Sequence, residues 1–171
     1  MNIKGKHYKT IWLHPNNENI VQIIDQRWLP HQLVIADIKS AFRSETSMND
    51  PKVKKLRKLS GDLFRLTNQG QLFEMSTTIK DMWVRGAPLI GAAAAWGMYL
   101  ATVEVPASCA RDFFFEECYG KLLKTRPTAV NLKWALDEML QSITGNDSII
   151  ESRWYGKSRA EWISADDIKV N

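Results

Sequence analysis

Apolar and polar residues alternate near the start of the chain in a way that predicts a small antiparallel sheet. Residues 8–13 alternate enough to form a strand, and β-branched residues favour a second strand over 20–25. The sequence His-Pro-Asn-Asn at 14–17 is typical of a turn, so these strands are expected to form a hairpin. Residues 33–37 predict a third strand, and three strands with one apolar face can cover helices.

Helical spacing replaces this alternation in the second half of the chain. Residues 89–103 and 113–124 predict two helices. The first is rich in alanine and glycine, so that other helices can approach it closely. Larger side chains on the same helix are expected in the core: Trp96, Met98, Tyr99 and Leu100.

Two further helices are predicted from their start signals. Proline favours the first turn of a helix, so the next helix is expected to begin at Arg126-Pro127. A break over 145–147 ends it, and the capping-box pattern of Ser158 and Glu161 predicts a last helix running to the end of the chain. The core positions expected on the first of these helices are Val130, Trp134, Leu136, Met139 and Leu140.

Residues 40–77, between the sheet and these helices, contain a basic amphipathic pattern. Apolar residues at helical spacing predict a helix that starts near Pro51 and ends at Thr67. Residues 52–65 hold six basic side chains against one acid, Asp62. Such a helix could contact RNA, an acidic surface or a partner groove, but a solvated face on a surface excursion is the simpler interpretation.

The composition is that of one globular domain. The chain has 171 residues, of which 44% are hydrophobic and 25% charged, enough to bury one core. Its longest apolar stretch, 87–101, includes a proline and two glycines and is shorter than the ~18 residues of a membrane span. Polar residues near the N-terminus do not fit a signal peptide. We therefore expect a cytoplasmic protein without a membrane partner.

Charge, cysteines and histidines narrow the function classes only slightly. The net charge of +4 permits contact with a polyanion without requiring it, and the aromatic residues are interpreted as packing groups, so no nucleic-acid partner is expected. Cys109 and Cys118 lack further ligands at metal-site spacing and are interpreted as reduced packing residues. His31 has no nucleophile or carboxylate close to it in sequence, which favours a structural role over that of a base.

Two arginines stand immediately before predicted helix starts, an arrangement that indicates an anion site. Arg85 precedes Gly-Ala-Pro, and Arg126 precedes Pro-Thr-Ala. If the two helix ends converge, their free amides and two guanidinium groups could hold one phosphate, and Gly86 with Ala87 would let the ligand approach the backbone. The alternative is two ordinary helix starts with surface arginines.

Three blocks in a fixed order carry a resemblance to a known family. They span residues 24–31 (Ile-Asp-Gln-Arg-Trp-Leu-Pro-His), 79–92 (with Arg-Gly-Ala-Pro-Leu-Ile-Gly) and 125–140 (starting Thr-Arg-Pro-Thr-Ala-Val-Asn-Leu). Together they resemble the N-terminal region of the S-methyl-5-thioribose-1-phosphate isomerase family. That family belongs to a wider group with the regulatory subunits of translation initiation factor 2B and ribose-1,5-bisphosphate isomerases.

The resemblance and the patterns together predict an α+β fold, with a small N-terminal antiparallel sheet followed by a mainly helical bundle. Its expected parts are a β-rich part, 1–39; an insertion with the basic helix, 40–77; a helical core with the substrate-binding motifs, 78–144; and a tail or interdomain helix, 145–171. In the family this helix leads to a C-terminal Rossmann-like domain that carries the catalytic cysteine and aspartate. The chain stops before that domain, so we expect a truncated chain that holds no catalytic residue and is inactive alone.

The resemblance also implies a function. The complete family enzyme converts 5-methylthioribose 1-phosphate to 5-methylthioribulose 1-phosphate in methionine salvage, as a homodimer and without a metal or organic cofactor. Arg85, Gly86, Ala87 and Arg126 match family positions that contact this sugar phosphate. The alternative is a non-catalytic regulatory or binding module of the initiation factor 2B-like group, with the insertion as a contact for a partner or RNA.

Overall fold

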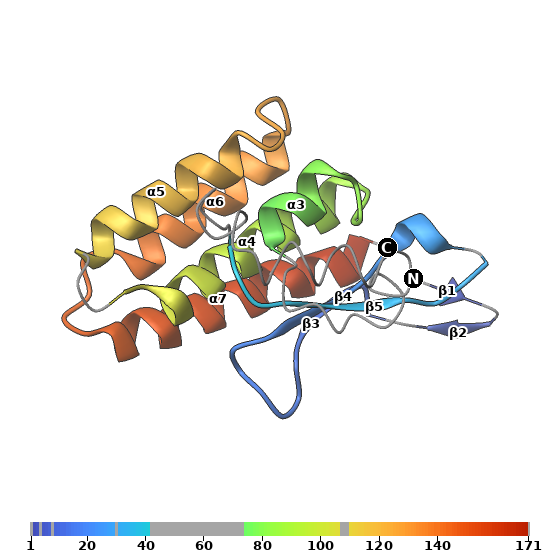
Figure 1. Ribbon diagram of the computed structural model, residues 1–171, viewed down its shortest axis with the longest axis horizontal. Helices are drawn as coiled ribbons and strands as arrows, with labels where there is room; N and C mark the ends of the chain where they lie inside the picture. Colours follow the sequence, from blue (N-terminus) through green and yellow to red (C-terminus); the bar gives the residue numbers. More distant parts are fainter. Residues whose placement is uncertain are drawn as a thin grey trace, which may run out of the picture.

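A small antiparallel sheet lies beside a bundle of helices in the computed structural model, which describes residues 2–3, 5–7, 9–29, 31–41, 74–106 and 110–170 (Figure 1). This architecture confirms the predicted α+β class. The predicted insertion helix, from near Pro51 to Thr67, lies outside the described residues. The helices are η1 (Gln26–Trp28), α3 (Met75–Lys80), α4 (Ala87–Glu104), α5 (Arg111–Leu123), α6 (Val130–Ile143) and α7 (Ile149–Val170).

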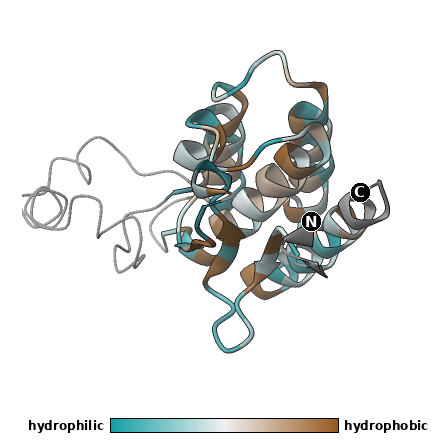
Figure 2. Ribbon diagram, turned by 90° about the vertical axis from the view of Figure 1, so that its right-hand side faces the viewer, coloured by the Kyte–Doolittle hydropathy of each residue, from teal (hydrophilic) through white to brown (hydrophobic). Residues whose placement is uncertain are grey.

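The three predicted strands form one antiparallel sheet. The strands are β3 (Ile11–Leu13), β4 (Val21–Ile24) and β5 (Ile35–Ile38), in that order, with Ile11 opposite Ile23 and Ile24 opposite Ile35. Most of β4, together with Ala36 and Ile38, is buried against the helices. The turn between β3 and β4 is hydrophilic and lies at the edge of the molecule (Figure 2). A further hairpin, β1 (Asn2–Ile3) with β2 (Lys6–His7), was not predicted.

Helix α4 lies at the centre and contacts α3, α5, α6, α7 and β3. Every residue from Leu89 to Thr102 is buried, including the four larger residues predicted for the core. Small side chains make this possible, because they let the neighbouring backbones come close. Two of its glycines mark such contacts: a Cβ on Gly91 would lie 3.2 Å from the Asn131 carbonyl oxygen, and one on Gly97 would lie 3.1 Å from Leu122 Cδ1.

The predicted start of α6 is wrong by three residues. Pro127 does not begin the helix but follows Arg126 in a turn, in which the Ala129 N–H donates to the Arg126 carbonyl at 3.1 Å. Proline is favoured at the second position of such a turn, because its fixed φ suits that position as well as it suits a helix start. The helix begins only at Val130.

The start of α7 is also wrong, and its cause is a repeated motif. The helix begins at Ile149, and Ser158 and Glu161 lie inside it. The capping contacts occur ten residues earlier: the Glu151 N–H donates to Ser148 Oγ at 3.2 Å, and the Asp147 N–H donates to Glu151 Oε2 at 3.2 Å. The chain thus carries the same Ser-x-x-Glu spacing twice, and the first copy starts the helix.

Two of the predicted core positions on α6 are exposed. Val130 is 79% exposed and Trp134 is 43% exposed, whereas Leu136 and Met139 are fully buried and Leu140 is half-buried. Exposed rings also occur elsewhere on the helices, so the prediction that the aromatic residues serve packing is wrong for part of them. These rings belong to Phe113, Trp154, Tyr155 and Trp162.

The glycine contacts of α4 predict opposite effects for two alanine substitutions. Gly97→Ala should lower the free energy of unfolding by about 1–2 kcal/mol, because overpacking against Leu122 and Met75 outweighs the gain in helix propensity. Gly120→Ala is the matched control, since a Cβ on that helical glycine meets nothing within 4 Å. It should raise the free energy of unfolding by about 0.5–1 kcal/mol. Urea unfolding measures both, and equal shifts would contradict the close packing around α4.

Candidate functional site

Arg85 is presented by a short segment between α3 and α4. Trp83 and Val84 are buried, whereas Arg85 itself is exposed. Gly86 follows with a φ of 95°, a conformation that favours glycine, and α4 begins at Ala87 with Pro88 in its first turn, as predicted. The first helical bond runs from the Ile90 N–H to the Gly86 carbonyl at 2.9 Å. The amides of Ala87 and Leu89 therefore have no partner within the helix.

Arg126 is presented by the turn that precedes α6. This turn places three residues between the arginine and the helix, and Ala129 caps the helix without a side-chain hydrogen bond. Arg126 is half-buried. The second arginine therefore stands one turn away from its helix start rather than directly on it.

The two helix starts lie against each other. Gly91 is in the second turn of α4 and Asn131 is in the first turn of α6, and a Cβ on Gly91 would come within 3.2 Å of the Asn131 carbonyl oxygen. The helix starts that follow Arg85 and Arg126 therefore lie close together, which is the condition that the anion-site interpretation requires. Sequence reasoning did not identify Asn131, although the small residue at Gly91, one turn into a buried helix, was a signal for a close neighbour.

Neither arginine is engaged by another described side chain. The four ion pairs found within the described ranges are Arg27–Asp25, Lys133–Asp137, Lys157–Glu18 and Arg159–Glu138. No side-chain hydrogen bond joins Arg85 or Arg126 to a residue that the structure describes. The two guanidinium groups are thus not held in internal pairs there and can meet a ligand.

A hollow of about 300 Å³ opens directly after Arg126. It is lined by the turn 127–129 and by one face of α6 with Val130, Lys133, Trp134 and Asp137. The hollow explains why Val130 and Trp134 are exposed: they line a surface depression and not the core. It offers one cation, one carboxylate and an apolar wall next to the second arginine.

Asp137 at the edge of this hollow ties α5 to α6. Tyr119 Oη donates to Asp137 Oδ1 at 2.5 Å, and Lys133 Nζ donates to Asp137 Oδ2 at 2.8 Å. The bonds from Lys133 and then Tyr119 lower the pKa of Asp137, and the same contacts with Asp137 raise the pKa values of Lys133 and Tyr119. The carboxylate is therefore held ionised by its two donors.

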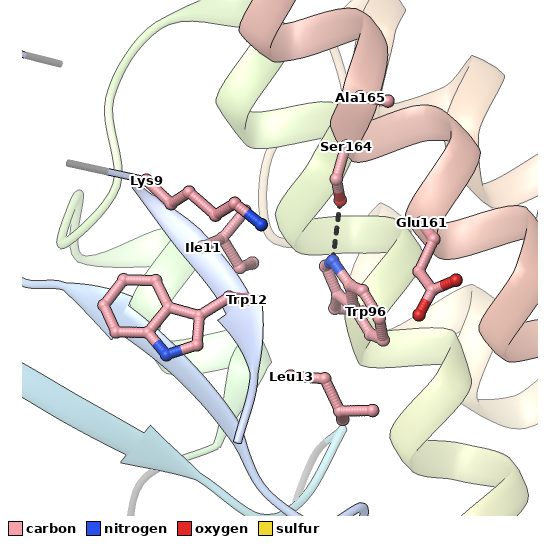
Figure 3. Close-up of a pocket in the computed structure, with 8 residues that line it drawn as sticks. All are labelled: Lys9, Ile11, Trp12, Leu13, Trp96, Glu161, Ser164 and Ala165. Atoms are coloured by element: carbon pink, nitrogen blue, oxygen red, sulfur yellow. Dashed lines mark hydrogen bonds between the residues drawn. The ribbon is translucent and has the colours of Figure 1, made fainter. Parts of the chain in front are cut away.

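A second hollow, of about 370 Å³, lies between β3 and the helices α4 and α7 (Figure 3). Trp12 and Lys9 line it on the strand side, and Trp96 lines it from α4, where its Nε1 donates to Ser164 Oγ at 2.6 Å. It contains none of the predicted site residues. The predicted phosphate contacts therefore do not involve it.

The remaining candidate residues fall outside both hollows. His31 is exposed, which argues against packing in the core, one of the two structural roles expected for it beside a loop hydrogen bond. Cys118 is fully buried in α5, as expected of a packing residue, and Cys109 lies outside the described residues. Among the residues with described positions, no group of three or more His, Cys, Asp and Glu side chains could hold a metal ion. None of the described helices is long and apolar enough to cross a membrane.

Comparison with solved structures defines the class of fold. The chain superimposes on subunit delta of translation initiation factor eIF-2B from A. fulgidus with a TM-score of 0.69 and 23% identity, over 95% of this chain and 38% of that one. It superimposes on 5-methylthioribose 1-phosphate isomerase from Pyrococcus horikoshii with a TM-score of 0.68 and 27% identity, over 97% of this chain and 38% of that one. The fold is that of the initiation factor 2B-like group. No family profile matches the chain.

Sequence comparison finds relatives of one kind within this group. Methylthioribose-1-phosphate isomerases are 42% identical over 144 residues in Paramagnetospirillum magneticum, 39% over 143 residues in Escherichia coli and 33% over all 171 residues in Sinorhizobium medicae. These matches cover 84%, 84% and 100% of this chain, but 30%, 29% and 37% of the relatives. The chain is similar over most or all of its length to methylthioribose-1-phosphate isomerases and spans about a third of the length of these curated relatives, which fits the expected N-terminal piece of that family.

The tie between α5 and α6 predicts a pH-dependent contribution to stability. Because the pKa of Asp137 is lowered on folding, its contribution is full above the unfolded pKa and is lost as pH falls through the folded pKa. Because the pKa of Tyr119 is raised, its contribution is lost only in strong base. Tyr119→Phe should therefore destabilise the protein by a constant amount from about pH 5 to pH 9, and the difference should shrink as pH falls through the folded pKa of Asp137.

Thermal unfolding of both proteins across this pH range measures the difference. Tyr155→Phe is a suitable control, because Tyr155 is exposed on α7 and no described residue accepts a hydrogen bond from its hydroxyl. A difference between wild type and Tyr119→Phe that persists in acid would show that the Asp137 carboxylate does not carry the contact.

Proposed function

We propose that this chain forms the sugar-phosphate-binding part of an isomerase that converts 5-methylthioribose 1-phosphate to 5-methylthioribulose 1-phosphate. The observation that carries the proposal is the contact between Gly91 and Asn131, which brings together the helix starts that follow the two arginines. Similarity to methylthioribose-1-phosphate isomerases supports the choice of sugar phosphate. Relatives with this name cover the chain over most or all of its length.

Arg85 and Arg126 are the proposed phosphate ligands. A guanidinium group presents several N–H donors in a plane and can give two parallel hydrogen bonds to one phosphate. Gly86 and Ala87 leave the backbone open, since a Cβ on Gly86 would meet nothing within 4 Å. The amides of the first turn of α4 can then add donors, and the helix dipole favours the negative charge there.

The proposed role of these groups is to bind and orient the substrate. Phosphate on the anomeric carbon prevents simple opening of the sugar ring, so an acid must assist release of the ring oxygen before hydrogen moves between the first two carbons. Holding the phosphate fixes those carbons relative to the acid and base, which saves much of the entropic cost of reaction. We assign the acid and base to the part of the relatives that this chain does not span, so the chain alone should bind substrate without turning it over.

Calorimetric titration with 5-methylthioribose 1-phosphate tests this function. Arg126→Ala should weaken binding by about 10- to 100-fold, as expected when a charge-assisted hydrogen bond to phosphate is lost, and Arg85→Ala should do the same. Arg153→Ala is the matched control, because the Arg153 guanidinium donates to the Thr102 carbonyl near the other end of α4. Binding of equal strength by wild type and Arg126→Ala would refute the assignment.

The same titration distinguishes the proposed isomerase function from the alternative, a regulatory or binding module. A regulatory or binding module of the initiation factor 2B-like group should not bind the sugar phosphate, but should retain RNA or a protein partner in a salt-sensitive way. The likeness to the initiation factor subunit, at 23% identity, shows the fold alone. A cytoplasmic location, and a homodimer for the complete enzyme, stay predictions from the sequence.

A further inference from the structure

The first of the three matched sequence blocks, residues 24–31, has no substrate contact in the proposed function, and the structure suggests another role for it. Asp25 in this block is 1% exposed and caps η1 by accepting a hydrogen bond from the Arg27 N–H at 3.1 Å. The same carboxylate accepts two bonds from the Arg27 guanidinium, 2.9 Å from Nε to Oδ1 and 2.6 Å from Nη2 to Oδ2. These parallel bonds fix the plane of the guanidinium group.

The fixed guanidinium group lies over the ring of Trp83. Its central carbon is 4.0 Å from the ring centroid, a distance at which a cation is attracted to the face of an indole. The backbone of Trp83 is held by the same short helix, because the Gln26 N–H donates to the Trp83 carbonyl at 2.8 Å. On its other side, the Trp83 N–H donates to the Thr78 carbonyl at 2.9 Å. Trp83 is therefore held through both its ring and its backbone.

Trp83 precedes Arg85 by only two residues. Val84 between them is fully buried, which leaves the segment little freedom before Arg85 emerges. Sharp bends flank this anchored segment: Met82 has a φ of 59° and Gly86 has a φ of 95°. Because the chain turns sharply on both sides of this segment, the position of the Arg85 backbone depends on how firmly Trp83 and Val84 are held.

We propose that Arg27, oriented by Asp25, is a positioning residue for Arg85. It acts through Trp83 and does not itself contact the ligand. This inference rests on the proposed function, because it takes Arg85 as a phosphate ligand. In that function, the Asp-Gln-Arg segment fixes the backbone from which Arg85, the first proposed phosphate ligand, projects.

Arg27→Lys tests the inference with little risk of unfolding. Lysine keeps a positive charge beside the buried Asp25 but loses the planar group that stacks on Trp83 and makes two parallel bonds. We expect the affinity for 5-methylthioribose 1-phosphate, measured by calorimetry on the full chain, to fall by about fivefold. Asp25→Asn removes the partner charge and should weaken binding in the same direction, which provides a second variant.

Amide hydrogen exchange, measured by NMR, reports the position of Trp83 without ligand. The amides of Gln26 and Trp83 should exchange faster in Arg27→Lys, because the hydrogen bonds that they donate depend on the stacked ring staying in place. Tyr99→Phe is the control variant. It removes the bond from Tyr99 to the Glu18 carbonyl, and Tyr99 lies about 18 Å along α4 from Ala87, so it should lower stability without changing affinity or these two amides.

The outcomes separate this inference from the proposed function. Weaker binding together with faster exchange at Gln26 and Trp83 supports it. Unchanged affinity in Arg27→Lys, beside a wild-type chain that binds, overturns this inference alone. Weaker binding with unchanged exchange also overturns it, because the loss would not pass through Trp83. A wild-type chain that does not bind the sugar phosphate overturns the proposed function, and this inference with it.

Discussion

Burial of α4 on all sides is the constraint on which the rest of the structure depends. A helix surrounded by four other helices (α3, α5, α6 and α7) and the strand β3 can have no polar face. It also needs small side chains wherever another backbone crosses it. Gly91 serves the crossing with α6, and Gly97 serves the crossings with α3 and α5. On α7 the corresponding position is Gly156, where a Cβ would lie 3.1 Å from Ile143 and 3.7 Å from Thr102. The positions of these glycines thus determine where the helices of the bundle can cross.

The candidate site is a direct result of this packing. Since Gly91 lets α6 approach the first turns of α4, two helix starts with free amides meet at one end of the bundle. Each start is preceded by a chain segment too irregular to be helical, and each segment carries an arginine that no described side chain engages. The proposed anion binding therefore rests on the fold itself, and the arginines would add charge and specificity to it.

The sequence predicted correctly those elements for which the local residue pattern is compatible with only one structure. The alternating strands and the turn before Pro88 were correct, because alternation and a proline in the first helical turn each have a clear structural consequence. Pro127 misled, because the same fixed φ serves a turn and a helix start. The error at Val130 and Trp134 came from combining two faces of α6: the buried residues repeat at helical spacing on another face, at Leu132, Ala135, Leu136, Met139 and Ile143. Only tertiary contacts decide which face is covered.

The chain leaves the sheet at Ser40 and Ala41 and enters α3 at Met75, and these two points lie together. This contact separates the position of the candidate site from the length of the segment between them. The chain just after β5 is fixed by Glu104, the last residue of α4, which accepts bonds from Ser40 Oγ at 2.7 Å and the Ala41 N–H at 2.9 Å. The start of α3 is fixed at the same point, because the N–H groups of Met75 and Ser76 donate to the Ser40 and Ala41 carbonyls at 2.8 and 3.0 Å. Since the two ends meet and are anchored to α4, the length of chain between them can change without moving α3. The turn that carries Arg85 follows α3 directly, so it keeps its place whatever lies between.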